Sequence, residues 1–360
     1  MREADGYAAT LSSSVAIDRS YVRFLRVSGR APTQMLKGLV SGSIPPALSE
    51  PVAGIRRGRV TYSALLTPKG KTVTDLRITR LENGEGGSLL LEFPPSGIEG
   101  AEAHFRKYLP PRFARLESLE RAFGLLSVIG PGAVQALATA VEPWGGDAAL
   151  LATLGEGEEV VLDEGPMRGV RLVRSGEVIP VAFDVVGDAE ILEEIGSRLE
   201  ENGTLCPPEG SALWNTLRIE RGRPAFGIDF DGETLPPEVG ITDRAIDHRK
   251  GCYTGQEVIV RIRDRGKVNR RLHGLLLGTA PPPDPGTPLY APERSRPVGE
   301  TRSSVPSPRF GQTVALGYLR QEVGLRDTIR LGTPDGLPVA VRALEDRGWV
   351  LVEGDPDFVP

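Results

Sequence analysis

The chain has 360 residues, of which 39% are hydrophobic and 25% charged, with a formal net charge of −5 at pH 7. This length suits two or three domains, and this composition is typical of globular proteins but not of proteins that bind duplex DNA over most of their surface. Two cysteines cannot make a disulfide scaffold, and no apolar stretch approaches the roughly 20 residues of a transmembrane helix, so we expect no membrane partner.

The N-terminal third predicts one α+β lobe. A strand or strand pair is expected over residues 15–27, a short helix over 31–40 and a hairpin over 58–81. A further strand over 88–93 and a helix over 99–109, ended by Pro110 and Pro111, complete the pattern.

A second cycle of similar elements follows. A strand over 125–131 precedes a small-residue helix over 133–141, strands near 160–162, 170–173 and 178–186, and an amphipathic helix over 189–202. We therefore expect two similar α+β lobes, approximately 1–112 and 113–270, whose segments can be interleaved.

The composition and residue pattern of the remaining chain change near residue 270. Residues 211–220 are compatible with a helix or a strand, and residues 258–263 alternate like a strand, with Arg261 and Arg263 pointing outward. Residues 280–308 are rich in Pro, Ser and Gly, and short strands with turn signals follow. This pattern predicts a small antiparallel β-barrel domain over 271–360.

The chemistry is concentrated in the octet Lys250-Gly251-Cys252-Tyr253-Thr254-Gly255-Gln256-Glu257. A cationic neighbour and free backbone N–H groups favour the thiolate of Cys252, and flanking glycines permit a positive φ or a close backbone approach. The alternative is a turn cysteine that only packs. The other cysteine, Cys206, stands before two prolines and is interpreted as structural.

Metal sites are not expected. Two cysteines and three histidines occur without a C-x-x-C or H-E-x-x-H pattern, and a complete [4Fe–4S] site normally takes four thiolates.

The polar N-terminus lacks the apolar segment of a secretory signal, so we expect a cytoplasmic protein with reduced thiols.

The octet, with the upstream string from Arg218 to Pro224 and then Asp229 and Pro237-Glu238, resembles the YgfZ family, which is related to the T-protein (aminomethyltransferase) of the glycine cleavage system. The resemblance continues in residues 286–319 and, more weakly, in the hairpin over 65–78. One departure is the stretch 39–45, which lacks the acid that the family commonly carries after its first helix.

This resemblance implies an α+β fold of the T-protein type: a three-lobed ring of two α+β lobes and a small C-terminal barrel around a central tetrahydrofolate pocket. It implies a folate-binding role in the assembly or maintenance of iron–sulfur enzymes, with tetrahydrofolate or a one-carbon derivative as cofactor. The implied partners are iron–sulfur client enzymes or assembly proteins.

Several residues follow from the resemblance as candidates. Cys252 and Lys250 are the candidates for chemistry, with Asp75, which stands where T-protein relatives carry a catalytic aspartate. The expected folate contacts are Arg218, Glu220, Glu177, Tyr253 and Gln256. A guanidinium suits a glutamate carboxylate and a carboxylate suits pterin N–H groups, but structural ion pairing is the alternative for Arg218 and Glu220.

Three hypotheses remain open from the sequence. The first is a folate-binding accessory protein that uses Cys252. The second is a folate-dependent aminomethyltransferase that uses Asp75 as a base or electrostatic partner. The third is an adaptor that binds tRNA or protein through the basic run over 249–271, whose simpler interpretation is a solvated face.

Overall fold

The computed structural model describes residues 3–120, 122–142, 147–208, 210–292, 294–324, 328–345, 348–352 and 355. Two compact units are present. The first comprises Met1–Leu65, Thr74–Trp214 and Arg249–Tyr253, and the second comprises Leu66–Val73, Asn215–His248 and Thr254–Pro360. Segments far apart in the sequence are therefore interleaved in both units.

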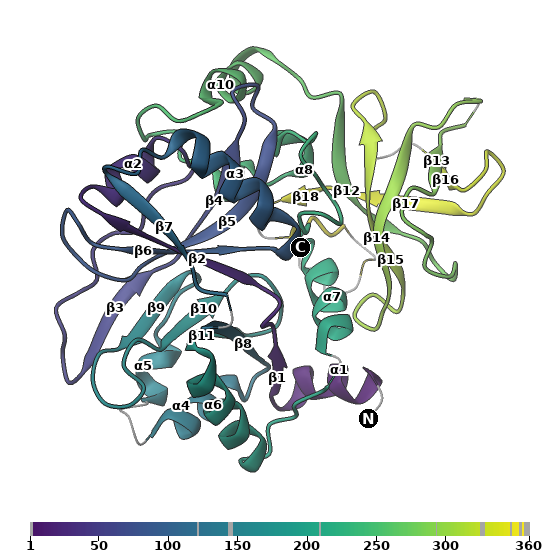
Figure 1. The fold of residues 1–360 in the computed structure, drawn as a ribbon. Helices are drawn as coiled ribbons and strands as arrows, with labels where there is room; N and C mark the ends of the chain where they lie inside the picture. The colour runs from purple at the N-terminus through teal and green to yellow at the C-terminus, as the bar shows by residue number, and fades with distance from the viewer. Residues whose placement is uncertain are drawn as a thin grey trace. The chain divides into compact units, whose positions relative to one another are not determined.

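The first unit contains a five-stranded sheet with the order β4-β5-β6-β2-β7 (Figure 1). Its strands are β2 (Arg23–Gly29), β4 (Thr61–Leu66), β5 (Thr72–Arg80), β6 (Leu89–Phe93) and β7 (Ala114–Ser118). In β5, Thr74, Leu76 and Ile78 are buried while Asp75 and Arg77 are only half-buried, which is the alternation of a strand with one more accessible face. The expected hairpin is confirmed.

The helices of this part lie beside the strands that precede or follow them in the chain. They are α1 (Glu3–Ser12), α2 (Pro32–Lys37), the single 3-10 turn at Pro95–Gly97 and α3 (Ile98–Tyr108). In α3, Ala101 and Phe105 are buried, one turn apart on one face, and the ring of Phe105 meets that of Phe93 edge-on at 6.4 Å.

A six-stranded sheet with the order β1-β8-β11-β10-β9-β3 also belongs to the first unit. Its strands are β1 (Val15–Asp18), β3 (Ile55–Arg59), β8 (Phe123–Ile129), β9 (Glu158–Leu162), β10 (Arg171–Ser175) and β11 (Ala182–Asp188). The strand expected from residue 178 begins only at Ala182, because Pro180 has no N–H for a ladder. The strand β3 was not predicted from the sequence.

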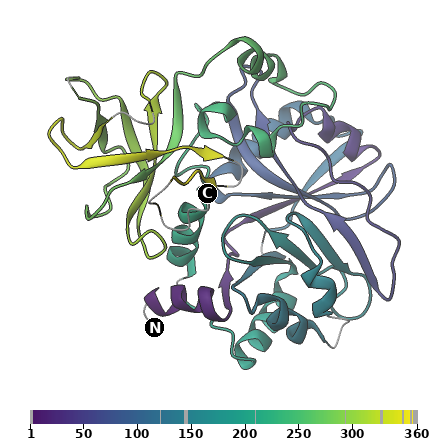
Figure 2. The same cartoon turned by 180° about the vertical axis from the view of Figure 1, so that it is seen from behind.

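Helices α4 (Ala133–Val141), α5 (Ala148–Ala152) and α6 (Ala189–Glu201) gather beside the six-stranded sheet, as Figure 2 also shows from behind. Leu192, Ile195 and Leu199 of α6 lie in one apolar cluster with Phe183 and Val185 of β11. Asp188 caps α6 by accepting a hydrogen bond from the backbone N–H of Glu190 at 3.0 Å. A smaller apolar cluster, including Phe24, Leu90, Leu125 and Val186, joins the two sheets of this unit.

The second unit is built on a closed six-stranded antiparallel barrel with the order β12-β15-β14-β13-β16-β17. Its strands are β12 (Arg270–Leu276), β13 (Pro288–Tyr290), β14 (Gly299–Ser307), β15 (Gln312–Arg320), β16 (Ile329–Leu331) and β17 (Pro338–Arg342). Leu275, Leu289, Ala315 and Ile329 are fully buried inside it. The expected α+β class with a small C-terminal barrel is confirmed.

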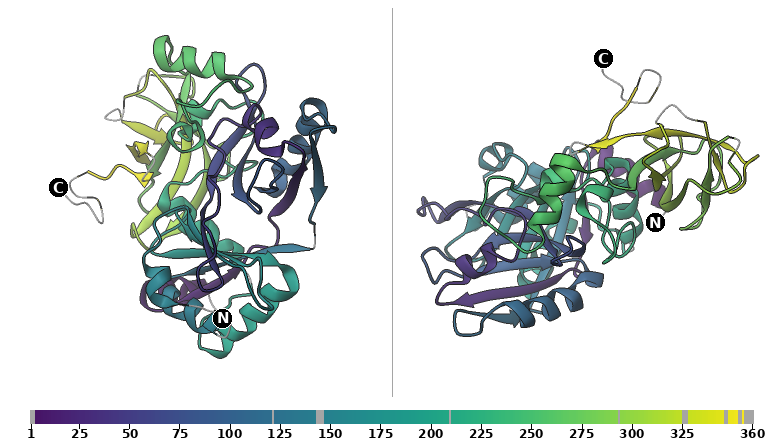
Figure 3. Two further views of the ribbon diagram at one scale, coloured as in Figure 1. Left: turned by 90° about the vertical axis from the view of Figure 1, so that its left-hand side faces the viewer. Right: turned by 90° about the horizontal axis from the view of Figure 1, so that it is seen from above.

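The other elements of this unit are mostly short helices. They are α7 (Gly210–Arg221, whose first turns belong to the first unit), α8 (Pro236–Val239), α9 (Thr242–Ala245), α10 (Gln256–Arg265) and the strand pair β18 (Leu344–Glu345) and β19 (Gly348–Trp349). Figure 3 shows α10 as a helix from two directions. Within the described residues, no helix is both long and apolar enough to cross a bilayer.

The prediction of a strand over residues 258–263 is wrong. Those residues form α10, in which Ile259 is buried and Val258 and Ile262 are half-buried, while Arg261 and Arg263 are exposed. The β-branched run favours a strand locally, but residues 258, 259 and 262 also share one helical face. An acid in the first turn and two arginines in the last turn fit the helix dipole.

Candidate functional site

The octet spans a loop that ends at the start of α10. Cys252 is an exposed free cysteine, whereas Tyr253 next to it is 7% exposed. Gly255 has a φ of +84°, and a Cβ at this position would lie 2.6 Å from the carbonyl oxygen of Thr67. Gly255 is thus required by the backbone, whereas a Cβ at Gly251 would meet nothing within 4 Å.

Lys250 is held by the first unit. Its Nζ donates hydrogen bonds to the carbonyl oxygens of Val40 at 2.6 Å and Gly42 at 2.7 Å, and it lies 5.5 Å from the ring centroid of Tyr253. The 40–42 loop is itself fixed, because Ser41 and Ala64 exchange hydrogen bonds and Gly42 donates to Ser63 Oγ at 2.7 Å. Lys250 therefore ties the segment that carries Cys252 to a rigid loop.

Asp75 lies on the half-buried face of β5. Its Oδ2 accepts a hydrogen bond of 2.7 Å from the hydroxyl of Tyr62 on the neighbouring strand β4. Arg77, two residues along, shares this face of β5. The phenol orients the carboxylate, so the two strands present a fixed acidic group beside a guanidinium.

Arg77 belongs to a buried charged network between the two sheets of the first unit. Its guanidinium donates to Glu92 at 2.6 and 2.9 Å and to Asp184 at 2.5 Å, and Asp184 also accepts from Ser127 at 2.6 Å. Burial opposes the charge of Arg77, but Glu92, Asp184 and, more weakly, Glu177 raise the pKa of the guanidinium above its ordinary value.

The two carboxyls of this network shift in opposite directions. Burial would raise the pKa of Asp184, but the charges of Arg77 and Arg19 and the hydrogen bond from Ser127 outweigh it, so this pKa is lowered. Burial dominates at Glu92 and raises its pKa despite the contact with Arg77. Both carboxyls contact Arg77, and the two differ in the balance between burial and neighbouring positive charge.

Glu177 follows β10 in the first unit. Its backbone N–H donates to Ser175 Oγ at 3.4 Å, and its side chain is half-buried. Its charge makes the smallest of the contributions that raise the pKa of Arg77. Tyr62 and Asp75 are thus joined by a hydrogen bond, whereas Arg77 bonds to Glu92 and Asp184 and the backbone of Glu177 bonds to Ser175.

Arg218 and Glu220 lie in the second unit. Because α7 is a helix, residues two apart point in very different directions, and the shared strand face considered from the sequence does not occur. Arg218 Nη1 donates to Asp229 at 2.7 Å and to the carbonyl of Arg223 at 2.9 Å. Glu220 accepts hydrogen bonds from the hydroxyl of Ser307 and, at 3.2 Å, from the backbone N–H of Arg309.

Asp229 completes this arrangement. It is fully buried and accepts hydrogen bonds from Arg218, from the backbone of Ala225 at 2.9 Å and from Ser303 of β14 at 2.5 and 3.1 Å. The contacts of Arg218 and Glu220 thus include ties between α7 and the barrel. Gln256, the first residue of α10, also belongs to the second unit and is half-buried.

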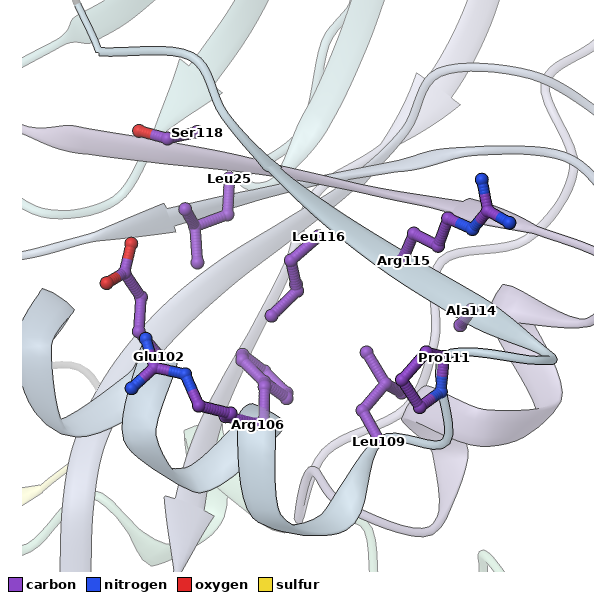
Figure 4. A pocket seen from close by; sticks show the side chains of 10 residues that line it. Leu25, Glu102, Arg106, Leu109, Pro111, Ala114, Arg115, Leu116 and Ser118 are labelled. Carbon is purple, nitrogen blue, oxygen red and sulfur yellow. The ribbon is translucent and has the colours of Figure 1, made fainter.

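Two of the cavities lined by described residues lie within the first unit. One of about 490 Å³ is lined by β1, β8 and α6 and by Cys206, whose thiol pKa is raised by burial and by the charge of Glu200. The other, of about 460 Å³, lies between α3 and the strands β2 and β7 (Figure 4). None of the predicted site residues lines either cavity. Among the described residues, no group of three or more His, Cys, Asp or Glu side chains is arranged to hold a metal.

Comparison with known families gives a clear assignment. A model of the GCVT N-terminal domain matches residues 4–250, and a model of the glycine cleavage T-protein C-terminal barrel domain matches residues 270–345. The chain belongs to the GCVT family. This agrees with the T-protein relationship expected from the octet and its flanking segments.

Curated GCVT relatives include aminomethyltransferases from Exiguobacterium sibiricum, 27% identical over 89% of this chain and 86% of that protein, and from Rubrobacter xylanophilus, 29% identical over 76% and 70%. The mitochondrial aminomethyltransferase of Gallus gallus is 28% identical over 84% of this chain and 73% of that protein. A crystal structure of aminomethyltransferase T from Bartonella henselae superposes with a TM-score of 0.77 at 20% identity, covering 96% of this chain and 91% of that one. The chain therefore has the T-protein fold.

Two residues of this GCVT site were not predicted from the sequence. Tyr62 is half-buried near the start of β4 and gives no separate signal in the sequence, although it lies on the strand next to Asp75. Asp229 was noted only as part of the family string, yet it is fully buried and accepts hydrogen bonds from Arg218, Ala225 and Ser303. A lone aspartate in a Gly- and Pro-rich stretch does not reveal its burial.

Proposed function

We propose that this chain binds tetrahydrofolate or a one-carbon derivative and uses Cys252 in the assembly or maintenance of iron–sulfur enzymes. Aminomethyltransferases of the GCVT family use tetrahydrofolate. The observation that supports the role of Cys252 is its exposure in an octet where Lys250, Tyr253 and Gly255 hold the loop.

Three contacts support that argument. Lys250 binds two carbonyl groups, Tyr253 is buried, and Gly255 is needed for a left-handed turn against Thr67. Each of these residues holds the loop, whereas the thiol itself remains accessible. Packing therefore does not explain the cysteine, and a thiolate that attacks or donates one ligand does.

Asp75 and Glu177 of the first unit, with Tyr62 beside Asp75, are the proposed contacts for the pterin ring of the folate. Asp75 and Glu177 can accept hydrogen bonds from pterin N–H groups, and Tyr62 fixes the orientation of Asp75. Arg218 and Glu220 already bind protein partners in a structural role. We therefore expect them, and Gln256, to contribute less to folate binding than Asp75 and Glu177.

The thiol is tested by complementation. Cells that lack this chain are supplied with the wild type, Cys252→Ser or Cys206→Ser, and the activity of an iron–sulfur enzyme is measured. Wild type and Cys206→Ser are expected to restore activity and Cys252→Ser to fail at equal protein level. Full restoration by Cys252→Ser removes the thiol from the mechanism.

A second candidate is aminomethyl transfer to tetrahydrofolate. The Tyr62–Asp75 hydrogen bond of 2.7 Å favours it, because it holds a carboxylate in place as a base or electrostatic partner for a folate nitrogen. The names of the GCVT relatives are consistent with this chemistry. Turnover of an aminomethyl donor that is lost in Asp75→Asn and kept in Cys252→Ser selects this candidate over the first.

A further inference from the structure

The strand β7 forms one edge of the five-stranded sheet. It pairs with β2 along its whole length, from Leu25 opposite Ser118 to Gly29 opposite Ala114. In the part of the chain that the structure describes, no strand pairs with its other side. An unpaired edge is a template for another strand unless charge or proline blocks it.

The hydrogen bonds show which backbone groups face outward. At the two ends of the β2–β7 ladder, Arg30 donates to Phe113 at 2.9 Å and Leu119 donates to Phe24 at 3.0 Å. Antiparallel ladders alternate, so residues 113, 115, 117 and 119 direct their N–H and C=O groups to β2. Residues 114, 116 and 118 therefore direct theirs to the free edge, and the Ala114 N–H is used there by Pro110 at 3.2 Å.

The free edge borders the cavity of about 460 Å³ beneath α3. Figure 4 shows Leu25 and Leu116 pointing toward α3, whereas Arg115 points away from it. Glu102 and Arg106 of α3 line the same cavity, together with Leu109. The edge thus offers an added strand unpaired backbone groups, the apolar side chain of Leu116 and charged side chains of both signs.

We propose that a second copy of this chain pairs with β7 in antiparallel orientation, with the two-fold axis at Leu116. In this register Leu116 faces Leu116 of the second copy, and residue 114 faces residue 118. These are the residues whose backbone groups point outward, so the pairs are the hydrogen-bonded ones. Because the Ala114 N–H is bonded to Pro110, each 114–118 pair uses the Ser118 N–H and the Ala114 C=O. The Leu116 side chains of both copies lie on the face that carries α3, and the sheet continues through the interface.

Charge selects this register. Arg115 of one copy lies directly opposite Glu117 of the other, twice by symmetry, in the closely spaced non-hydrogen-bonded pairs. A shift by two residues in either direction keeps the hydrogen-bonding pattern but places Arg115 opposite Arg115, or Glu117 opposite Glu117. The edge is therefore self-complementary in one register only, as an isologous dimer requires.

The test measures self-association of the full chain by sedimentation over a dilution series from nanomolar to high micromolar. Wild type is expected to dimerise. Arg115→Glu and Glu117→Arg are each expected to weaken the dimer by about tenfold or more, because two symmetry-related pairs become like-charged. The double variant Arg115→Glu/Glu117→Arg restores opposite charges and is expected to regain the affinity of the wild type.

Both side chains are exposed, so the single variants are expected to fold like the wild type. Arg168→Glu makes the same charge change on an exposed loop outside the sheet and serves as the matched control. A chain that stays monomeric at every concentration overturns the proposal. A dimer that ignores both single variants also overturns it, since another surface then forms the contact.

Discussion

Near Cys252, which is exposed, Lys250 and Tyr253 hold the loop. Lys250 was expected to act with the thiol, but its Nζ is engaged by the carbonyls of Val40 and Gly42. The lysine thus has a positioning role for the segment, and its position in the octet reflects the 40–42 loop, which is far away in the sequence. That partner could not be inferred from the sequence, because carbonyl groups leave no residue signature.

The two thiols should differ in reactivity. Cys252 is exposed, whereas Cys206 is half-buried and has a pKa raised by burial and by Glu200. Alkylation followed by mass spectrometry at pH 7 should modify Cys252 at least about tenfold faster. The rate at Cys206 should keep rising above pH 9, since its thiolate forms only as the pH approaches the raised pKa. Faster labelling of Cys206 at pH 7 would contradict the assigned exposures.

Removing the positioning lysine should loosen the octet. Lys250→Met leaves the carbonyls of Val40 and Gly42 without their cationic donor, which should lower the free energy of unfolding by about 2 kcal/mol. Chemical denaturation and limited proteolysis within residues 248–256 would report the change. Lys69→Met, at an exposed turn, is the matched control and should remain within about 0.5 kcal/mol of the wild type.

At the scale of elements, α7 and the barrel are joined through a buried aspartate. Asp229 has no exposed surface and accepts hydrogen bonds from Arg218, Ala225 and Ser303. Asp229→Asn should destabilise the chain by about 3 kcal/mol, because it leaves the buried guanidinium of Arg218 without a counter-charge. Denaturant unfolding would measure this loss.

The control for that variant is Asp231→Asn, two residues away and exposed. Its carboxylate binds only local groups of Glu233 and Thr234, and asparagine can accept the same hydrogen bonds. A change below about 0.5 kcal/mol is expected there. Equal losses in the two variants would show that the Arg218–Asp229 pair is not a stabilising contact.

Periodicity predicted the elements whose local pattern agrees with their packing. The hairpin of β4 and β5, the helices α3 and α6 and the barrel strand β15 fall where the sequence indicated. The failure at α10 has a specific cause: its β-branched run satisfies both periods, and contacts such as Val258 against Gly70 select the helix. The strand β3 was missed because it is short and contains four polar or glycine positions in a row.

At the scale of the molecule, the residues predicted for the site are distributed over the two units of the GCVT fold. The first unit holds Asp75, Glu177 and the segment with Lys250 and Cys252, and the second holds Arg218, Glu220 and Gln256. The residue types of the site were predictable from the resemblance. Which of these polar residues are accessible, and which join elements of the fold, could be told only from the hydrogen bonds of the structure.

Folate binding is the central claim, and direct titration tests it. Tetrahydrofolate is titrated anaerobically into the wild type, Asp75→Asn and Cys252→Ser, and the heat of binding is measured. The account predicts saturable binding at one site per chain in the wild type, about tenfold or more weaker binding in Asp75→Asn, and unchanged binding in Cys252→Ser. An absence of saturable binding of tetrahydrofolate and its one-carbon derivatives to the folded wild type would contradict it.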